Sequence, residues 1–422
     1  MTRFLFFAER WLWLAFLFLL PFQSRIILWQ SDWIFIEWHA ISLFVWDIAL
    51  ISLFAVAFWR GWRPFDGAKI NRALITLGAL SLCSVAWAIN VPIALYATIR
   101  LVEGILLFWY VRRVIHENML APSIIAFSVA MIFQAMLGIG QFFVHHDFRL
   151  WILGEPSISP TMHGVAVFFS LTGERVMRAY GTFPHPNIFA AFLTASLWGI
   201  AWLWRHTSSL RMRIMWLCTA MVLGVALATT FSRTIVAVLI AAITVLMVNV
   251  WRRQSYMKYV FSVIVAMLIF ASIVWPATIA RLKISGGDEA VAMRVEYAKD
   301  ALYSGNGFFG KINLFGVGAG NFTYWLADAV PNMPRYWYQP AHNIFLMAYS
   351  EIGLIGLLIF IGFLVLQFRT NASIEIKALA LIFVIVGLTD HFFWTLAQGQ
   401  MLWWIVLGLL TKHDILGHHG QN

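Results

Sequence analysis

The chain alternates long apolar runs with short polar linkers. Stretches such as residues 41–59 and 216–230 are apolar on all sides and show no period of two. A membrane-spanning barrel strand would alternate over about 10 residues, whereas runs of roughly 17–25 apolar residues are typical of membrane-spanning helices. Helices also satisfy their own backbone hydrogen bonds in hydrocarbon. The pattern therefore predicts an all-α polytopic membrane protein.

About twelve spans are predicted, and the last two are short for membrane spans. They lie near residues 4–21, 40–59, 72–89, 95–111, 121–144, 187–204, 214–230, 234–250, 259–276, 342–366, 378–392 and 399–411. Two linkers are much longer than the others, at about residues 145–186 and 277–341. We predict a single membrane domain over residues 1–422, from which these two loops project.

Composition narrows the class of protein. The chain is 61% hydrophobic and 11% charged, whereas soluble domains are about 45–50% apolar and roughly 25% charged. A soluble globular enzyme and a disordered chain are both excluded. Cys83 and Cys218 lie in separate apolar runs and form no disulfide framework or CxxC motif. The net charge of +10 is typical of a membrane protein whose basic cytoplasmic loops lie beside anionic lipid. It does not indicate a nucleic-acid partner.

Basic residues cluster in alternate linkers and predict the orientation. One set of linkers contains Arg60, Arg63, Lys69, Arg72, Arg112, Arg113, Arg205, Arg211, Arg213, Arg252, Arg253, Lys258, Arg369 and Lys377. The short linkers of the other set contain only Arg25 and Arg233. The positive-inside rule places the first set and both termini in the cytoplasm, so the two long loops are extracytoplasmic. Because long loops on a rigid scaffold often carry function, we expect the site on the outer face.

The second long loop is predicted to be partly helical. Within residues 290–302, Val291, Val295, Ala298 and Leu302 follow one another at spacings of four, three and four. Such spacings describe one face of a helix.

Four features of the predicted outer face stand out in order along the chain. They are GTFPHPN at residues 181–187, FSRT at 231–234, Arg294 on the loop helix, and PAHN at 340–343 followed by YSEIGLIG at 349–356. On this topology they resemble the O-antigen ligase and polymerase family of bacterial envelope glycosyltransferases. The segments GVGAGNF at 316–322 and AHNIFLMAYSEIGLIG at 341–356 carry most of the resemblance. It covers residues 180–365 closely and the rest of the chain through topology.

The resemblance implies a C-type glycosyltransferase fold and an outer-face enzyme of the bacterial inner membrane. Such an enzyme moves a glycan from a polyprenyl-diphosphate carrier, typically undecaprenyl diphosphate, to an acceptor hydroxyl, without a metal or another cofactor. The acceptor is a lipid A-core, another glycan or another hydroxyl. We favour a ligase on the modest chain length and the single large outer loop after the ninth span, with a polymerase as the alternative. A flippase for lipid-linked oligosaccharides is the alternative from a different class, and it predicts broken helices, inverted repeats and a charged path.

The resemblance also implies roles for individual residues. It places the two arginines that handle the diphosphate at Arg233 and Arg294, and the histidine that serves the acceptor at His342. His185, Asn187, Asn343 and Tyr297 are candidates for acceptor binding or loop support, and relatives often have Trp in place of Tyr297. Arg281, Lys283 and Arg335 are substitutes for Arg294 in the same loop.

The residue types suit these roles. Arginine stays charged and offers a planar fork of donors that matches phosphate oxygens, and such donors stabilise charge that develops in a transition state. An imidazole with a pKa near 6.5 can accept a proton from a hydroxyl. The alternative interpretations are structural: an interfacial anchor for Arg233 and a helix cap for His342.

Arg100, Glu103 and Asp47 lie within predicted spans, where ionisable residues are by default candidates for a functional role. Arg100 and Glu103 are three apart on one helix and should pair with each other, whereas Asp47 has no predicted partner. We expect Glu351 to be buried with a partner on another helix. Metal binding is not predicted. Asp32 and Glu37 form no paired acidic motif, and the loop histidines match no ligand spacing; they are His145, His146, His163 and His185.

Overall fold

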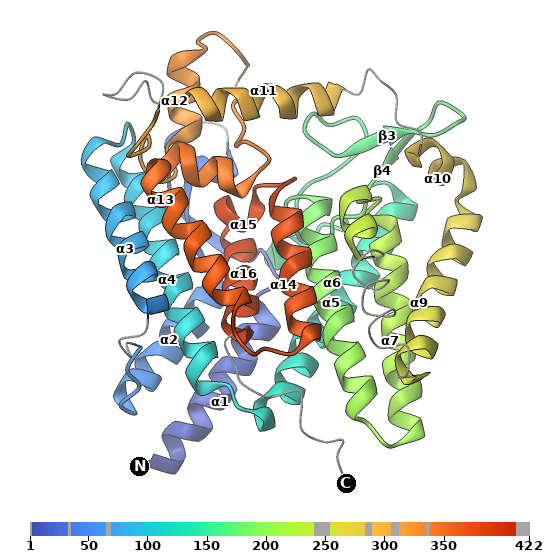
Figure 1. The fold of residues 1–422 in the computed structure, drawn as a ribbon. Coiled ribbons are helices and arrows are strands. Elements are labelled where there is room, and N and C mark those ends of the chain that lie inside the picture. The colour runs from blue at the N-terminus through green and yellow to red at the C-terminus, as the bar shows by residue number, and fades with distance from the viewer. Residues whose placement is uncertain are drawn as a thin grey trace. The chain divides into compact units, whose positions relative to one another are not determined.

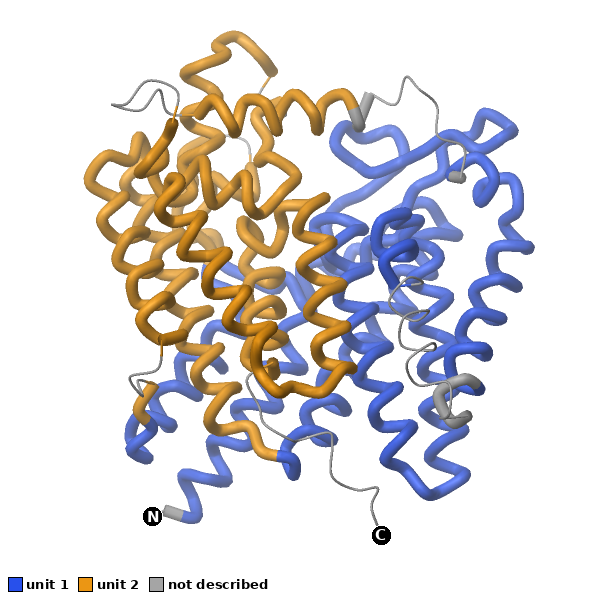
Figure 2. Tube along the Cα trace, in the orientation of Figure 1, with its two compact units in different colours: residues 1–26, 43–62, 117–285 blue, residues 27–42, 63–116, 286–422 orange. Residues whose placement is uncertain are grey.

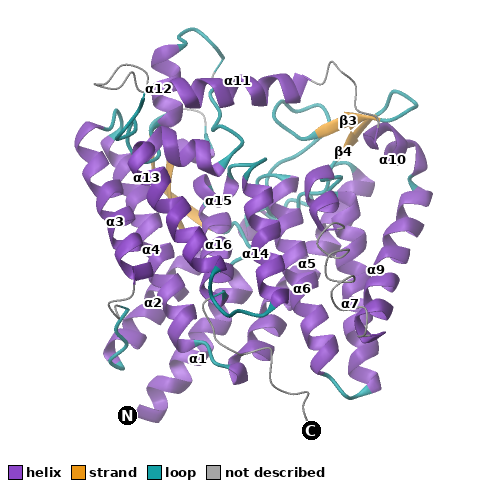
Figure 3. Cartoon of the chain, in the orientation of Figure 1, coloured by secondary structure: helices purple, strands orange, loops and turns teal. Residues whose placement is uncertain are grey.

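The computed structural model describes residues 2–32, 35–64, 69–239, 254–282, 289–304, 312–334 and 337–410. Helices dominate this part of the chain (Figures 1 and 3). The α-helices are α1 (Thr2–Leu19), α2 (Val45–Trp59), α3 (Lys69–Ser84), α4 (Val91–Val114), α5 (Glu117–Val144), α6 (Pro186–His206), α7 (Leu210–Thr229), α9 (Gln254–Ile273), α10 (Trp275–Leu282), α11 (Glu289–Tyr303), α12 (Phe322–Ala329), α13 (Ile344–Phe368), α14 (Ile374–Gly387), α15 (Phe392–Thr395) and α16 (Ala397–Leu409). The mostly helical architecture confirms the predicted class.

Short strands and 3-10 turns lie between the helices. Strand β1 (Arg25–Gln30) pairs with β2 (Ala40–Phe44), and β3 (Val167–Phe169) pairs antiparallel with β4 (Arg175–Met177). The 3-10 turns are η1 (Glu37–His39), η2 (Val85–Trp87) and η3 (Trp151–Leu153).

Among the described residues, six helices are long and apolar enough to cross a membrane: Lys69–Trp87, Val91–Val114, Glu117–Val144, Pro186–His206, Leu210–Thr229 and Ile344–Phe368. A seventh candidate in the same part of the chain is broken, because Lys258–Ile273 and Trp275–Arg281 meet at a bend of 101°. The chain is therefore a polytopic membrane protein, and the number twelve stays a prediction. Most of the predicted span near 234–250 lies outside the described residues, which here end with helical residues 233–239.

The prediction of a helix throughout residues 40–59 is wrong at its start. Residues 40–44 form β2, and α2 begins only at Val45. The carboxylate of Asp47 accepts a hydrogen bond from the backbone N–H of Phe44 at 2.7 Å. This bond satisfies a backbone donor at the start of the helix, which gives Asp47 a structural role.

The chain divides into two compact units, which Figure 2 distinguishes by colour. Unit 1 comprises residues 1–26, 43–62 and 117–285, and unit 2 comprises residues 27–42, 63–116 and 286–422. In unit 1, α5 packs against α1, α6 and α7, and α7 also packs against α9. In unit 2, α4 packs against α3 and α16, and α13 packs against α3, α11 and α15. Features 181–187 and 231–234 therefore lie in unit 1, whereas Arg294 and 340–356 lie in unit 2.

Helix α13 is broken at Gly353, and the segment 313–318 forms hydrogen bonds on both sides of the break. Gly353 has φ 76° and ψ −178°, a conformation that is essentially restricted to glycine. Backbone hydrogen bonds connect Val317 N to Ser350 O at 2.8 Å, Gly318 N to Glu351 O at 3.0 Å, Leu354 N to Asn313 O at 2.8 Å and Ile355 N to Leu314 O at 3.4 Å. The glycine-rich segment thus forms the hydrogen bonds of backbone N–H and carbonyl groups that lack a partner within the helix at the break. The glycine allows close backbone approach here, because a Cβ at Gly353 would meet the backbone of Leu314.

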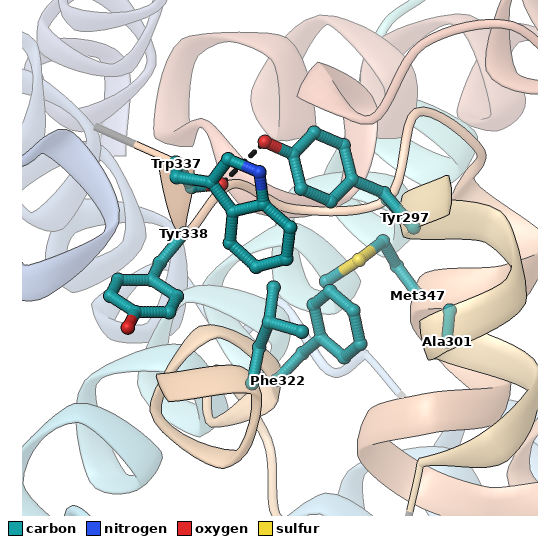
Figure 4. Packing of buried hydrophobic residues seen from close by; sticks show 8 residues of the cluster. Tyr297, Ala301, Phe322, Trp337, Tyr338 and Met347 are labelled. Carbon is teal, nitrogen blue, oxygen red and sulfur yellow. Dashed lines mark hydrogen bonds between the residues drawn. The ribbon is translucent and has the colours of Figure 1, made fainter. Parts of the chain in front are cut away.

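Helix α11 coincides with the predicted loop helix, and its residues Val295 and Leu302 are 51% and 52% exposed. Tyr297 and Ala301 are buried instead, and they pack against Phe322 and other residues of a hydrophobic cluster (Figure 4). The Tyr297 ring meets that of Trp337 edge to face, with 5.5 Å between the ring centroids.

Three other ionisable residues of the predicted spans, Arg100, Glu103 and Glu351, have partners. Arg100 Nη1 lies 2.7 Å from Glu103 Oε2, which confirms the predicted pair, and Arg100 Nη2 also donates to the carbonyl of Ser42. Glu351 is buried and accepts a hydrogen bond at 2.9 Å from Nε1 of Trp394 on α15. The prediction of a buried Glu351 with a partner on another helix is confirmed.

Candidate functional site

His342 lies at the centre of a cluster of ionisable side chains in unit 2. Its Nδ1 is 3.8 Å from Oδ1 of Asp390, and its ring centroid is 5.0 Å from that of His391. The His342 side chain is 19% exposed, whereas that of Asp390 is only 8% exposed. The arrangement places a partly accessible imidazole beside a buried carboxylate, which can stabilise the protonated ring.

Local structure fixes the position of His342. Asn343 is the N-cap of α13, and its side-chain oxygen accepts hydrogen bonds from the N–H groups of Phe345 and Leu346. Asn343 Nδ2 also donates to the carbonyl of Leu388 at 3.2 Å, which ties the start of α13 to the segment that carries Asp390. Helix capping is therefore the task of Asn343, and the imidazole of His342 is not needed for it.

The second ring of the cluster is held from both sides. His391 Nδ1 lies 2.6 Å from the Thr395 hydroxyl, and the ring of Trp38 meets His391 edge to face at 6.0 Å. The backbone N–H of His391 donates to the carboxylate of Asp390. Asp390 is thus oriented by its own neighbour in sequence.

Arg294 lies half-buried on α11 in the same unit. In the part of the chain that the structure describes, no hydrogen bond or ion pair of Arg294 is found. A half-buried guanidinium offers a planar fork of donors that matches the oxygens of an anion.

Tyr297 anchors the helix that carries Arg294. Its hydroxyl donates to the backbone carbonyl of Trp337, as the dashed line in Figure 4 shows. Burial raises the pKa of Tyr297, and the neighbouring charges of Glu296 and Asp300 raise it further. The tyrosine is therefore neutral at physiological pH and supports the loop.

Arg233 lies in unit 1, directly after a tight turn. α7 ends at Thr229, and Phe231 has φ 46°, in the left-handed region that bulky residues rarely adopt. Ser232 is buried, whereas Arg233 is half-buried at the start of helical residues 233–239. Arg233, the first of the two arginines predicted to bind the diphosphate, thus directly follows this turn.

The motif at residues 181–187 contacts this turn. Asn187 Oδ1 accepts a hydrogen bond from the Ser232 hydroxyl at 3.2 Å and another from Nη2 of Arg178 at 2.7 Å. His185 is the N-cap of α6, and its Nδ1 accepts from the N–H of Asn187 at 3.1 Å. Both residues therefore support loops in this structure.

Sequence reasoning missed Asp390, His391 and Arg178. For the first two a signal exists, because an acidic residue and a histidine interrupt the predicted span at 378–392. For Arg178 we find no sequence signal, since it lies in a long loop outside every motif.

Asp32 of the first outer loop binds a histidine. Its Oδ2 is 2.6 Å from Nδ1 of His39, and His39 Nε2 lies 2.9 Å from the Thr323 hydroxyl. Burial lowers the pKa of His39 to about 4, despite the adjacent carboxylate. The neutral ring therefore donates to Asp32 through Nδ1 and accepts from Thr323 through Nε2.

One group of described residues could hold a metal ion. His342, Asp390 and His391 each offer a ligand atom, and these atoms lie within 4.8 Å of one another. Two imidazoles and a carboxylate are suitable ligands for Zn²⁺.

Comparison with known proteins identifies one family. Residues 218–361 match the family model described as O-antigen ligase. The match includes Arg233, Arg294 and His342, whereas Arg178, Asp390 and His391 lie outside it. No curated protein and no solved structure matches the chain.

Proposed function

We propose that this polytopic protein, a member of the O-antigen ligase family, is an outer-face glycosyltransferase of the bacterial inner membrane. Its donor would be a glycan on a polyprenyl diphosphate, with undecaprenyl diphosphate as the expected carrier. Its acceptor would be a hydroxyl of a lipid A-core or of another glycan. The observation that carries the proposal is the His342–Asp390 pair.

His342 is the proposed general base. It accepts the proton of the acceptor hydroxyl, and the oxygen then attacks the anomeric carbon of the donor sugar. The bond from that carbon to the diphosphate oxygen breaks, and the electron pair leaves with the diphosphate. Asp390 stabilises the resulting imidazolium and orients its ring, as a carboxylate does beside a catalytic histidine.

Arg233 and Arg294 are the proposed diphosphate-binding residues. Negative charge builds up on the leaving diphosphate, so fixed guanidinium groups favour the transition state over the ground state. Within the described residues no carboxylate pairs with Arg294, which leaves its donors available for phosphate oxygens. No metal or other cofactor is needed in this mechanism, because the arginines supply the positive charge.

The direct test is a transfer assay with purified protein, a polyprenyl-diphosphate-linked glycan and two acceptors. We expect a product on a lipid A-core if the protein is a ligase, and longer lipid-linked chains if it is a polymerase. His342→Ala should lower kcat by about 10²–10⁴-fold, the usual contribution of a general base. Full activity of the His342→Ala, Arg233→Ala and Arg294→Ala variants would overturn the assignment.

The same reagents separate an enzyme from a flippase. A flippase would move labelled lipid-linked glycan across a proteoliposome membrane without changing its covalent structure. A transport path would be lined by ionisable residues within the membrane, but Arg100 pairs with Glu103 and Asp47 accepts a hydrogen bond from the backbone N–H of Phe44. We therefore expect covalent transfer. Between the ligase and the polymerase we favour the ligase, on the modest chain length and the single large outer loop after the ninth predicted span.

A further inference from the structure

Arg178 is a buried cation in unit 1 that has no part in the chemistry proposed above. It directly follows β4 and is 6% exposed. A buried charge is costly unless hydrogen bonds compensate it. Arg178 Nε donates to the carbonyl of Thr230 at 2.6 Å, and its Nη2 donates to Oδ1 of Asn187 at 2.7 Å. One guanidinium thus joins the turn before Arg233 to the start of α6.

A second set of hydrogen bonds reinforces this connection. The Ser232 hydroxyl donates to Oδ1 of Asn187 at 3.2 Å, and the Ser232 N–H donates to the Thr230 hydroxyl at 3.3 Å. Asn187 Oδ1 therefore accepts from Arg178 and from the residue that directly precedes Arg233. Movement of Asn187 or Arg178 would be transmitted to Arg233 through Ser232.

The turn needs such support because its backbone is strained. Phe231 adopts φ 46°, and a non-glycine residue persists there only where its surroundings hold it. The Phe231 ring packs against Phe168 at 4.8 Å and Phe142 at 5.7 Å between centroids. Arg281 Nε donates to the Phe231 carbonyl at 3.3 Å. Two successive carbonyls of the turn thus accept hydrogen bonds from guanidinium groups.

We propose that Arg178 is a positioning residue that, through Asn187 and Ser232, fixes the turn from which Arg233 reaches the lipid diphosphate. The inference rests on the proposed function, in which Arg233 binds the diphosphate. The planar fork of arginine holds two acceptors on two segments at once. Lysine would keep the charge without this geometry, so Arg178→Lys should be a poor replacement.

The test measures binding of undecaprenyl diphosphate to the full-length protein in nanodiscs, together with KM for donor and acceptor. Arg178→Gln should weaken diphosphate binding by about tenfold to a hundredfold, the range for loss of hydrogen bonds to a charged group. KM should rise for the donor and stay constant for the acceptor, which a general loss of structure would not produce. Arg175→Gln is the matched control, because Arg175 is exposed on β4 and its guanidinium lies over the ring face of Phe169. It should bind as the wild type does.

A double variant separates positioning from direct contact. If Arg178 acts only through Arg233, Arg178→Gln/Arg233→Ala binds as weakly as Arg233→Ala alone and no weaker. An additive further loss in the double variant would overturn the inference, as would wild-type binding by Arg178→Gln. Wild-type binding by Arg233→Ala would instead overturn the proposed function.

A milder substitution covers the case in which Arg178→Gln does not fold. Ser232→Ala removes one hydroxyl donor and should keep the thermal unfolding temperature of the wild type. We expect it to raise the donor KM severalfold and to leave the acceptor KM unchanged. An unchanged donor KM in this folded variant would contradict the proposal that Arg178 positions Arg233 through Asn187 and Ser232.

Discussion

Oδ1 of Asp390 lies 3.8 Å from Nδ1 of His342, so a buried carboxylate faces the imidazole that we propose as the general base. The distance is longer than a hydrogen bond, so the carboxylate acts on the imidazole through its charge. The pair joins the segment before α13 to the segment before α15, two regions that are remote in sequence.

The first prediction concerns this pair. Asp390→Asn should lower kcat by at least about tenfold, because the protonated form of His342 loses its stabilising charge. The effect should be smaller than that of His342→Ala, and the donor KM should change little. Initial rates of glycan transfer measure both quantities. Asp328→Asn is the control, since Asp328 is exposed on α12 in the same unit; wild-type turnover by Asp390→Asn would refute the role.

The second prediction concerns the guanidinium on α11. Arg294→Ala should lower kcat/KM for the donor by about a hundredfold or more, because a transition-state charge loses its donor. Arg294→Lys should recover only part of the activity, since lysine lacks the planar fork. Lys299→Ala provides the control on the exposed part of the same helix. Equal effects of Arg294→Ala and Lys299→Ala on donor kinetics would argue against diphosphate binding.

The third prediction separates the two chemistries that the His342 cluster could support. If the arginines supply the positive charge, EDTA should leave the transfer rate unchanged. Added Zn²⁺ should inhibit, because His342, Asp390 and His391 offer it three ligand atoms. Inhibition should be weaker in His391→Gln. Loss of activity with EDTA that a divalent cation restores would show that the reaction is metal-dependent.

The fourth prediction is a pH dependence of stability that arises from His39. An unfolded histidine titrates near pH 6.5, whereas burial lowers the pKa of His39 to about 4. Between these values the unfolded chain binds a proton that the folded chain does not. Stability from this group is therefore present above about pH 6.5 and is lost progressively as the pH falls to about 4.

The measurement is the thermal unfolding temperature at about pH 7.5 and about pH 5, on either side of the ordinary histidine pKa. His39→Gln should be less stable than the wild type at the higher pH, since it loses the fixed contacts to Asp32 and Thr323. The difference should narrow at the lower pH, where the wild type alone bears the protonation penalty. His116→Gln, at an exposed position of the same unit, should show no such change. A difference that stays constant between the two pH values would count against a neutral His39.

Local relationships in the chain could be predicted from the sequence, whereas relationships between remote segments could not. Arg100 and Glu103 are one helical turn apart, so their spacing alone predicts the pair. Asp390 and His342 meet only through the packing of α13 against α15, which no spacing encodes. On α11 Val295 and Leu302 of the apolar period are exposed, whereas Tyr297 and Ala301 are buried because Phe322 and Trp337 lie on their side. The left-handed Phe231 likewise depends on contacts from distant residues.

The last prediction tests the broken helix α13. A Cβ at Gly353 would collide with the backbone at Leu314, and its φ of 76° with ψ of −178° is essentially closed to other residues. Gly353→Ala should therefore destabilise the protein by at least about 1–3 kcal/mol. At Gly362, farther along α13, an added methyl group would meet no atom within 4 Å, so Gly362→Ala should be neutral or stabilising by up to about 1 kcal/mol. Thermal unfolding of both variants measures the contrast. Equal unfolding temperatures would mean that the segment 313–318 does not dock in the break of α13.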